Sequence, residues 1–330
     1  MKKLSAAAWA HFCVDLCCAA LYFGWLGRGA DWWLSMVLYN ACAFALQLPL
    51  GLLADRLDRN LPFAAAGCAL VAASFLLTAS PLSAAMVCGL GNGMFHVGAG
   101  LEVLNDSEKA APLGVFVSPG AVGLYLGSVW ADAFVQHGWI LPLVMVLTGP
   151  GLLMAGRKRS SRNAPLALDL SGAKVLPLVC LFLVVVLRSL LGSGAFSTGS
   201  VDAPGIVPVL CLAFGKAAGG FAGDMLGLRK TAFLSLGLTA ALLLLPRGGG
   251  TLAALFLFNM TMPLTLYEAV RLLPGAKGAA FGLLTCALFV GMLPRFLGYG
   301  GALPSFVWAG LVLLSLGLLW VGLRGERDHG

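Results

Sequence analysis

The stretch "GLLADRLDRN" at residues 51–60 decides the fold, because "GFAGDMLGLRK" at residues 220–230 repeats its layout. Both stretches follow a long apolar run. In each, a glycine stands four residues before an aspartate and basic residues come next: Gly51 with Asp55, and Gly220 with Asp224. Gly220 lies 169 positions after Gly51, about half of the 330 residues. The chain is therefore expected to consist of two related halves.

A second pair of positions repeats at a similar distance. Asn92 and Glu102 in the first half correspond to Asn259 and Glu268 in the second. Internal repeats of apolar helices, with a substrate site where the repeats meet, are typical of transporters. We therefore place Asn92 and Asn259 on a pathway through the protein.

The composition supports a membrane protein. Hydrophobic residues make up 59% of the chain and charged residues only 11%, against about 25% charged residues in soluble domains. A water-facing surface cannot be built from these residues. We expect the lipid bilayer and a small-molecule substrate as partners, no nucleic acid, and a protein that works as a monomer.

Apolar runs of about 20 residues mark membrane-spanning helices, and the sequence contains about twelve. The expected fold is an all-α integral membrane protein with two pseudo-symmetric six-helix halves. The expected halves are residues 1–155 and 174–323, with a cytoplasmic linker at 156–173 and a tail at 324–330. The expected spans lie near 6–27, 31–54, 61–79, 82–104, 110–133, 138–155, 174–196, 203–223, 230–246 (short), 251–270, 275–297 and 303–323.

The basic residues predict the orientation. With the N-terminus inside, sixteen of the 21 lysines and arginines fall at inner ends or loops. The outer side receives only Arg28 and Arg247, with Arg295 near an outer helix end. This is the positive-inside pattern, and it explains the formal charge of +7 without nucleic acid. We expect both termini in the cytoplasm and the protein in a bacterial-type inner membrane.

With these features in place, "GLLADRLDRN" resembles the loop signature of the major facilitator superfamily, although Asp58 stands where that family usually has glycine. "HFCVDL", "GNGMFHVGAG" and "LRSLLGSGAF" look most like fosmidomycin-resistance-type exporters, with Val97 replacing a usual proline. The resemblance implies a secondary active transporter that alternates access to a central site. It favours a proton-coupled exporter (an antiporter) of small organic compounds or drugs, anionic ones included.

Ionisable residues inside membrane helices are costly and are functional candidates by default. Asp15 lies near the middle of the first span, with His11 one turn away. We interpret Asp15 as the carboxylate that takes and releases a proton, tuned by His11; a fixed polar contact is the alternative. Arg188 is central in the seventh span, and its permanent charge needs an anion. That anion could be Asp15 across the halves or an acidic group of the substrate; we favour an alternation in which the substrate anion and the proton compete for this pair.

The loop motifs and the two glutamates are interpreted as gating machinery. Asp55 is expected to cap or brace the loop, while Arg56 and Arg59 hold neighbouring helix ends. Glu102 and Glu268 stand at inner helix ends and are expected to pair with loop arginines when the inner side is closed. The predicted gating residues are Gly51, Asp55, Arg56, Arg59, Glu102, Gly220, Asp224, Arg229 and Glu268.

The glycine-rich run "GLGNGMFHVGAG" at residues 89–100 continues an apolar helix, so it is not a phosphate loop. Gly89, Asn92, Gly93, His96 and Gly100 recur at helical spacing and share one face. We expect the glycines to allow close helix packing and Asn92 and His96 to project toward the bundle. His96 is interpreted as a proton or substrate contact, or alternatively as a histidine bonded to a neighbouring helix.

Other classes of function leave weaker traces. The stretch "HFCVDLCC" at residues 11–18 could supply metal ligands, but buried cysteines usually act as small hydrophobes, and we expect no metal. No HExxH, GxSxG or nucleotide-binding motif occurs, so we expect neither an enzyme nor a cofactor; the proton gradient is the expected energy source. The alternatives are a proton-coupled uptake symporter and, less favoured, a non-transporting membrane enzyme or scaffold.

Overall fold

The computed structural model describes residues 2–156, 162–196, 205–245, 250–299 and 303–323, and in these ranges it contains helices and no strand. Ten helical segments are long and apolar enough to cross a membrane. Ile140–Gly156 is a shorter apolar helix, and the helix Leu228–Leu243 lies where the short ninth span is expected. The protein is a multi-pass membrane protein, and the expected all-α fold class is confirmed.

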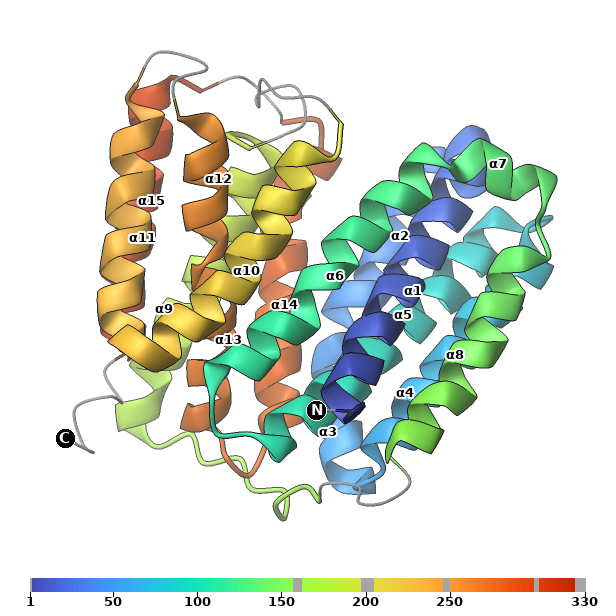
Figure 1. The fold of residues 1–330 in the computed structure, drawn as a ribbon, viewed down its shortest axis with the longest axis horizontal. Helices are drawn as coiled ribbons and strands as arrows, with labels where there is room; N and C mark the ends of the chain where they lie inside the picture. Colours follow the sequence, from blue (N-terminus) through green and yellow to red (C-terminus); the bar gives the residue numbers. More distant parts are fainter. Residues whose placement is uncertain (1, 157–161, 197–204, 246–249, 300–302, 324–330) are drawn as a thin grey trace.

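One bundle holds the helices of the first half (Figure 1). The second span is formed by α2, η2 and α3 together. The bounds are α1 Lys2–Gly24, η1 Leu26–Arg28, α2 Trp32–Asn40, η2 Ala41–Ala45, α3 Gln47–Leu57, α4 Asn60–Ser74, η3 Phe75–Leu77, α5 Pro81–Asp106, α6 Ala110–Val129, α7 Ala131–Gln136 and α8 Ile140–Gly156.

A second bundle holds the remaining helices (Figure 1): α9 Gly172–Ser193, α10 Val207–Leu226, α11 Leu228–Leu243, α12 Thr251–Asn259, α13 Thr261–Leu272, α14 Lys277–Phe296 and α15 Ser305–Gly322. The exact boundaries predicted for the halves, the linker and the tail stay predictions. Residues 157–161 of the linker and 324–330 of the tail lie outside the described residues.

The two bundles meet along two helix pairs, α3 with α14 and α6 with α10. Glycines make both approaches possible. A Cβ added at Gly51 would overlap the backbone of Gly278, and one at Gly220 would lie 2.8 Å from the carbonyl oxygen of Ala110. Small residues that allow backbone contact are the usual means of close helix packing in membranes. The glycines of the two loop motifs are therefore contact points between the halves.

Two spans are interrupted at mid-membrane depth. In the second span, a π-helical turn at Ala41–Ala45 separates α2 from α3. In the tenth, α12 ends at Asn259 and α13 begins at Thr261. Pro263 explains the second break, because a proline ring removes a backbone donor and clashes with the carbonyl four residues earlier. Irregular backbone inside a membrane protein is tolerated where it is buried in protein or lines a cavity, and both breaks lie beside the polar residues described below.

The linker is attached to the first loop motif. Asp58 is the one non-glycine residue with a positive φ, 49°, among the described residues. Its carboxylate accepts a hydrogen bond from the backbone N–H of Asn163 (2.6 Å). The Asn163 side chain donates to the Ala54 carbonyl (2.9 Å) and accepts from Asn60 and Asn105. The left-handed backbone explains why glycine is usual at position 58, and aspartate adds a bond to the linker.

Two substitutions separate these effects of Asp58. Glycine removes the bond but relieves a left-handed conformation that costs about 1–2 kcal/mol for a residue with a Cβ, so Asp58→Gly should leave stability nearly unchanged. Alanine loses the bond and keeps the strain, so Asp58→Ala should destabilise by about 1–2 kcal/mol. Thermal unfolding of the purified protein checks this pair. Equal destabilisation by both variants would mean that the hydrogen bond to Asn163 contributes more free energy than the left-handed backbone costs.

Candidate functional site

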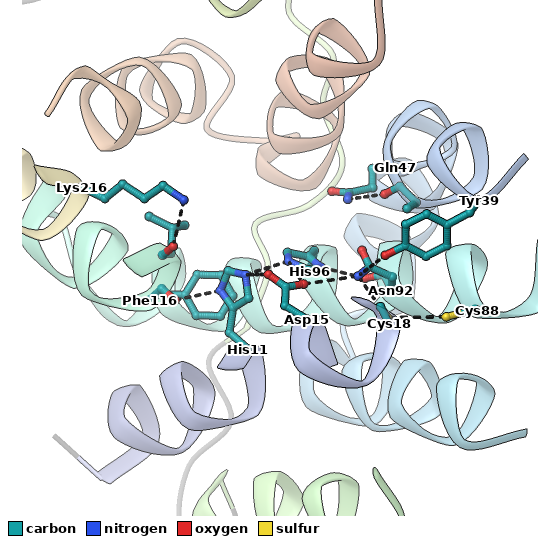
Figure 2. Close-up of polar contacts among 12 residues, drawn as sticks. His11, Asp15, Cys18, Tyr39, Gln47, Cys88, Asn92, His96, Phe116 and Lys216 are labelled. Atoms are coloured by element: carbon teal, nitrogen blue, oxygen red, sulfur yellow. Dashed lines mark hydrogen bonds and ion pairs between the residues drawn. The ribbon is translucent and has the colours of Figure 1, made fainter. Parts of the chain in front are cut away.

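Three titratable side chains of the first half converge inside the membrane (Figure 2). His11 and Asp15 stand one turn apart on α1, and His96 reaches them from α5. His11 Nε2 lies 3.2 Å from Asp15 Oδ2 and 2.9 Å from His96 Nε2, and His96 Nε2 lies 3.7 Å from Asp15 Oδ1. We call these three residues the triad. Asp15 and His11 are 7% and 5% exposed, so no bulk water offsets the charge of the carboxylate.

Backbone and amide groups hold the triad in place. His11 Nδ1 bonds to the Phe116 carbonyl of α6 (2.8 Å), and His96 Nδ1 bonds to the Asn92 carbonyl (2.9 Å). The Asn92 side chain donates to Asp15 Oδ1 (3.4 Å). A Cβ at Gly120 of α6 would collide with Asp15 and His11. The sequence periodicity that placed Asn92 and His96 on one face thus corresponds to side chains that both contact Asp15.

The glycines on that face of α5 lie against other helices. A Cβ at Gly89 would lie 2.5 Å from the Tyr39 carbonyl oxygen, and one at Gly93 would lie 3.2 Å from the Cys42 carbonyl oxygen. Gly100 faces Phe281 of α14, 2.7 Å from where its Cβ would stand. These glycines therefore act in packing, and Gly100 does so across the two halves.

The second half contains a cavity of about 250 Å³. Among the described residues that line it, Arg188 of α9 and Lys216 of α10 are the ionisable ones, and none of these described residues is a carboxylate. Most of the remaining wall is apolar, with polar groups from residues that include Ser189, Asn259, Thr265 and Thr285. Pockets for drug-sized ligands span about 300–1,000 Å³, so this cavity suits a small molecule.

Arg188 is buried, and its guanidinium uses neutral acceptors. It bonds to the Thr261 hydroxyl and to the Phe258 carbonyl (3.4 Å), the two groups that flank the break between α12 and α13. The Phe258 ring lies 5.0 Å from the guanidinium carbon. The Arg188 Nε is buried and has no hydrogen-bond partner among the described residues. The positive charge is therefore positioned by the protein but is not neutralised by a carboxylate within 4.0 Å among the described residues.

In this conformation the arrangement separates Arg188 from one of the two anions suggested for it. Asp15 pairs with His11 and His96 and forms no ion pair with Arg188 in the described part of the chain. The cross-half pair of Asp15 and Arg188 is therefore not present in this conformation, because each charge finds partners within its own half. An acidic group of a substrate is the alternative that remains.

Lys216 connects the cavity to the triad. Its ammonium donates to the Val117 carbonyl of α6 (3.3 Å) across the interface of the halves (Figure 2). The preceding carbonyl, that of Phe116, bonds to His11 of the triad. A cation of the cavity and a histidine of the triad thus hold adjacent peptide units of one helix.

The sequence did not single out Lys216 for the site, although it lies in the middle of an apolar span. From the sequence, Lys216 could neutralise a carboxylate or extend to the membrane interface, and the interfacial position was preferred. Asn259, which was singled out, lines the cavity and donates to the carbonyl of Leu255 on its own helix (2.8 Å). Tyr39 was also missed; its hydroxyl lies 3.3 Å from Asn92 Nδ2, a contact with no local sequence signal.

The two repeated aspartates cap helices of the opposite half. Asp55, at the end of α3, accepts hydrogen bonds from the N–H groups of Gly278 (2.9 Å) and Ala279 (3.0 Å) at the start of α14. Asp224, at the end of α10, accepts from Ala110 (2.8 Å) and Ala111 (2.9 Å) at the start of α6. A carboxylate on a helix N-terminus satisfies free donors and complements the helix dipole. We call this symmetric pair the clasp.

The two sides of the clasp differ in burial, which predicts unequal effects. Asp55 is buried and Asp224 is exposed. Asp55→Ala leaves the N–H groups of a buried contact without acceptors, at about 1–3 kcal/mol each, whereas the contact of Asp224 is only partly buried, so water reaches its N–H groups more readily once the side chain is removed. Hydrogen exchange at the start of α14 should accelerate about thirtyfold in Asp55→Ala, corresponding to about 2 kcal/mol.

The matched control is Asp224→Ala, read at the start of α6. Its expected acceleration is only a few-fold, since exposed charge pairs contribute about 0–1 kcal/mol. Equal acceleration in the two variants would show that burial does not set the strength of the clasp.

The two glutamates form ion pairs with cations other than the predicted loop arginines. Glu102 pairs with Lys3 (2.9 Å) and Glu268 with Arg271 (3.3 Å). No ion pair within 4.0 Å joins either glutamate to the predicted arginines in the described ranges. Arg56 and Arg59 are exposed, and the Arg229 guanidinium lies over the ring of Trp320 at 5.2 Å. The glutamates instead contact cations on α1 and on the next turn of α13, which are nearer in space.

Known proteins resemble this chain in structure and not in sequence. No family model and no curated protein sequence matches it. The E. coli fucose:proton symporter FucP aligns with a TM-score of 0.68 and 11% identity over 98% of each chain. The human organic anion transporter MFSD10 (TETRAN) aligns with a TM-score of 0.65 and 16% identity over 96% of this chain and 99% of its own. A bacterial homologue of the iron transporter ferroportin aligns with a TM-score of 0.65 and 12% identity over 98% of each chain.

FucP is a major facilitator superfamily transporter. This chain has the major facilitator fold. The alignments cover nearly the whole chain, so the fold extends over both halves. None of these three proteins is a fosmidomycin-resistance-type exporter, and the resemblance to that subgroup stays a prediction. In this major facilitator fold, the triad lies in the first half, the cavity in the second, and the clasp joins the two.

Proposed function

We propose that the chain is a proton-coupled secondary transporter of small organic anions. The observation that carries the proposal is the cavity lined by Arg188 and Lys216 with no carboxylate among its described lining residues. A buried, uncompensated positive charge is costly in a membrane protein, and an anionic group of the substrate would neutralise it. The apolar wall would hold the carbon skeleton, and its threonines and asparagine would orient it.

The triad supplies the proton site of this proposal. Asp15 can lose its proton to water or to a histidine only when the site is accessible from one side. The proton and the substrate then occupy different halves, which rock against each other in alternating access. His11 and Lys216 hold adjacent carbonyls of α6, so a substrate that draws Lys216 into the cavity also changes the helix that positions the triad. Transport needs no enzyme chemistry and no cofactor in this scheme.

Two directions of coupling are proposed, each supported by a different observation. The resemblance to fosmidomycin-resistance-type exporters supports export of the anion in exchange for protons. The charge distribution supports the alternative, uptake by symport, because a proton on the triad makes the region more positive and helps an anion bind. The clasp would close the side of the motif loops in either case.

The test uses proteoliposomes that contain a pH-sensitive dye and the purified full-length chain. Small carboxylates and phosphonates are added with their neutral analogues, with and without an imposed pH gradient. We expect proton flux that depends on the anion; its sign separates antiport from symport. Arg188→Ala proteoliposomes and protein-free liposomes are the controls. If no anion in a broad panel produces flux above protein-free liposomes, the proposal fails.

A further inference from the structure

The triad has one unusual property, which is that two imidazole nitrogens face each other. A carbonyl oxygen can only accept a hydrogen bond. His11 Nδ1 and His96 Nδ1 lie 2.8 and 2.9 Å from carbonyl oxygens, so both Nδ1 atoms carry hydrogen. The neutral form of each ring then has a bare lone pair on Nε2, and these two Nε2 atoms are 2.9 Å apart.

Lone pairs at that distance repel unless a proton on one of the two Nε2 atoms, or a metal ion bound by both, lies between them. The Asp15 carboxylate offers a third possible metal ligand. Its Oδ2 lies 3.2 Å from His11 Nε2, and its Oδ1 lies 3.7 Å from His96 Nε2. The three residues can each offer a ligand atom within 4.8 Å of the others. A tetrahedral metal ion with bonds of about 2.0–2.1 Å separates its ligand atoms by about 3.3 Å. From His11 Nε2, the separations are 2.9 Å to His96 Nε2 and 3.2 Å to Asp15 Oδ2, both close to that value. The other carboxylate oxygen, Oδ1, lies 3.7 Å from His96 Nε2.

The surroundings also match a metal site. Histidine ligands usually donate their other ring N–H to a carbonyl or carboxylate, which orients the ring, as both histidines do here. Asn92 holds the carboxylate from the other side through its bond to Asp15 Oδ1. The carboxylate and His11 are buried. Two imidazoles with one carboxylate favour first-row transition metals over magnesium or calcium, which prefer oxygen ligands.

We propose that His11, Asp15 and His96 bind one divalent transition-metal ion, of the class of Zn²⁺ or Co²⁺. The ion is bound by Nε2 of each histidine and by the carboxylate, and a water or a substrate group completes the coordination. The binding itself is independent of the proposed function. Its consequence rests on that function: a bound ion occupies the proton site and blocks proton-coupled transport.

Binding is measured on the purified full-length protein in detergent at equal pH throughout, with no gradient. Zn²⁺ titration by calorimetry and the visible absorption of Co²⁺ give stoichiometry and coordination. We expect one ion per chain in the wild type, and Asp15→Asn and His96→Gln should each weaken binding at least tenfold. His137→Gln, which changes an exposed histidine on the loop after α7, should not affect it. Cys18→Ser removes the thiol 3.4 Å from Asn92 and should also leave the affinity unchanged.

The outcomes separate this inference from the proposed function. Absence of stoichiometric binding in the wild type, or equal binding in Asp15→Asn and His96→Gln, overturns the metal site. If Cys18→Ser loses metal binding, the ion is bound by thiols, and the proposed site is overturned as well. Metal binding without anion-driven flux in proteoliposomes would leave the metal site standing and reject the transporter proposal. Normal anion-driven flux without metal binding would reject the metal site and leave the transporter proposal standing. Inhibition of flux at the Zn²⁺ concentration that saturates the site would support both.

Discussion

Asp15→Asn is expected to reduce proton-driven transport to the level of protein-free liposomes. Asparagine has nearly the same size and can still accept a bond from a neighbour, but it cannot bind or release a proton at any accessible pH. Asp15 is the carboxylate that contacts both His11 and His96, and no other carboxylate forms an ion pair with either histidine in the described part of the chain. The variant therefore removes the coupling group while it leaves the packing of α1 against α6 in place.

The measurement is dye-reported proton flux with a saturating anion, combined with size-exclusion and thermal unfolding of the purified variant. Asp31→Asn is the matched control, because it makes the same chemical change at an exposed residue and should transport like the wild type. Substrate binding by the Asp15→Asn protein should persist, since the cavity is in the other half. Full-rate, pH-dependent transport by Asp15→Asn would show that Asp15 is not the coupling carboxylate.

Arg188→Ala is expected to weaken binding of an anionic substrate by about ten- to a hundredfold. This loss corresponds to the free energy of a hydrogen bond to a charged group, about 1.5–3 kcal/mol. A neutral analogue of the same shape should lose much less. The guanidinium lines the cavity, keeps an unpaired buried Nε and has no carboxylate partner within the described residues. The positive charge of Arg188 is thus available to a ligand and is not neutralised by a carboxylate among the described residues.

Calorimetric titration of the purified variants with an anion and its neutral analogue checks this prediction. Arg188→Lys is the control: it keeps the charge and loses the planar fork, so it should recover part of the affinity for the anion. Equal losses for charged and neutral ligands would indicate that Arg188 mainly holds the break between α12 and α13, through Thr261 and the Phe258 carbonyl.

The features that local sequence predicts are those that depend on neighbouring residues along one helix. The number of spans, their approximate ends and the short ninth helix follow from the length of each apolar run, because the hydrocarbon core sets how many residues a helix needs. Helical spacing also placed Asn92 and His96 on one face of α5. The interruptions of the second and tenth spans were not expected from the apolar runs, although Pro263 in the second half was a local sign of one of them.

By itself, the sequence determined that this protein is a helical membrane protein with two related halves, since hydrophobic length and repeat spacing are properties of the chain. Only the tertiary structure decided which partner each buried charge takes. Asp15 lies against two histidines and not against Arg188; Asp55 and Asp224 cap α14 and α6 in the opposite halves. In a low-dielectric interior, a charge binds whichever group the helix packing brings within about 3–4 Å. Apart from His11, which stands one turn from Asp15, these partners lie between 81 and 223 positions apart along the chain, and no local pattern encodes their contact.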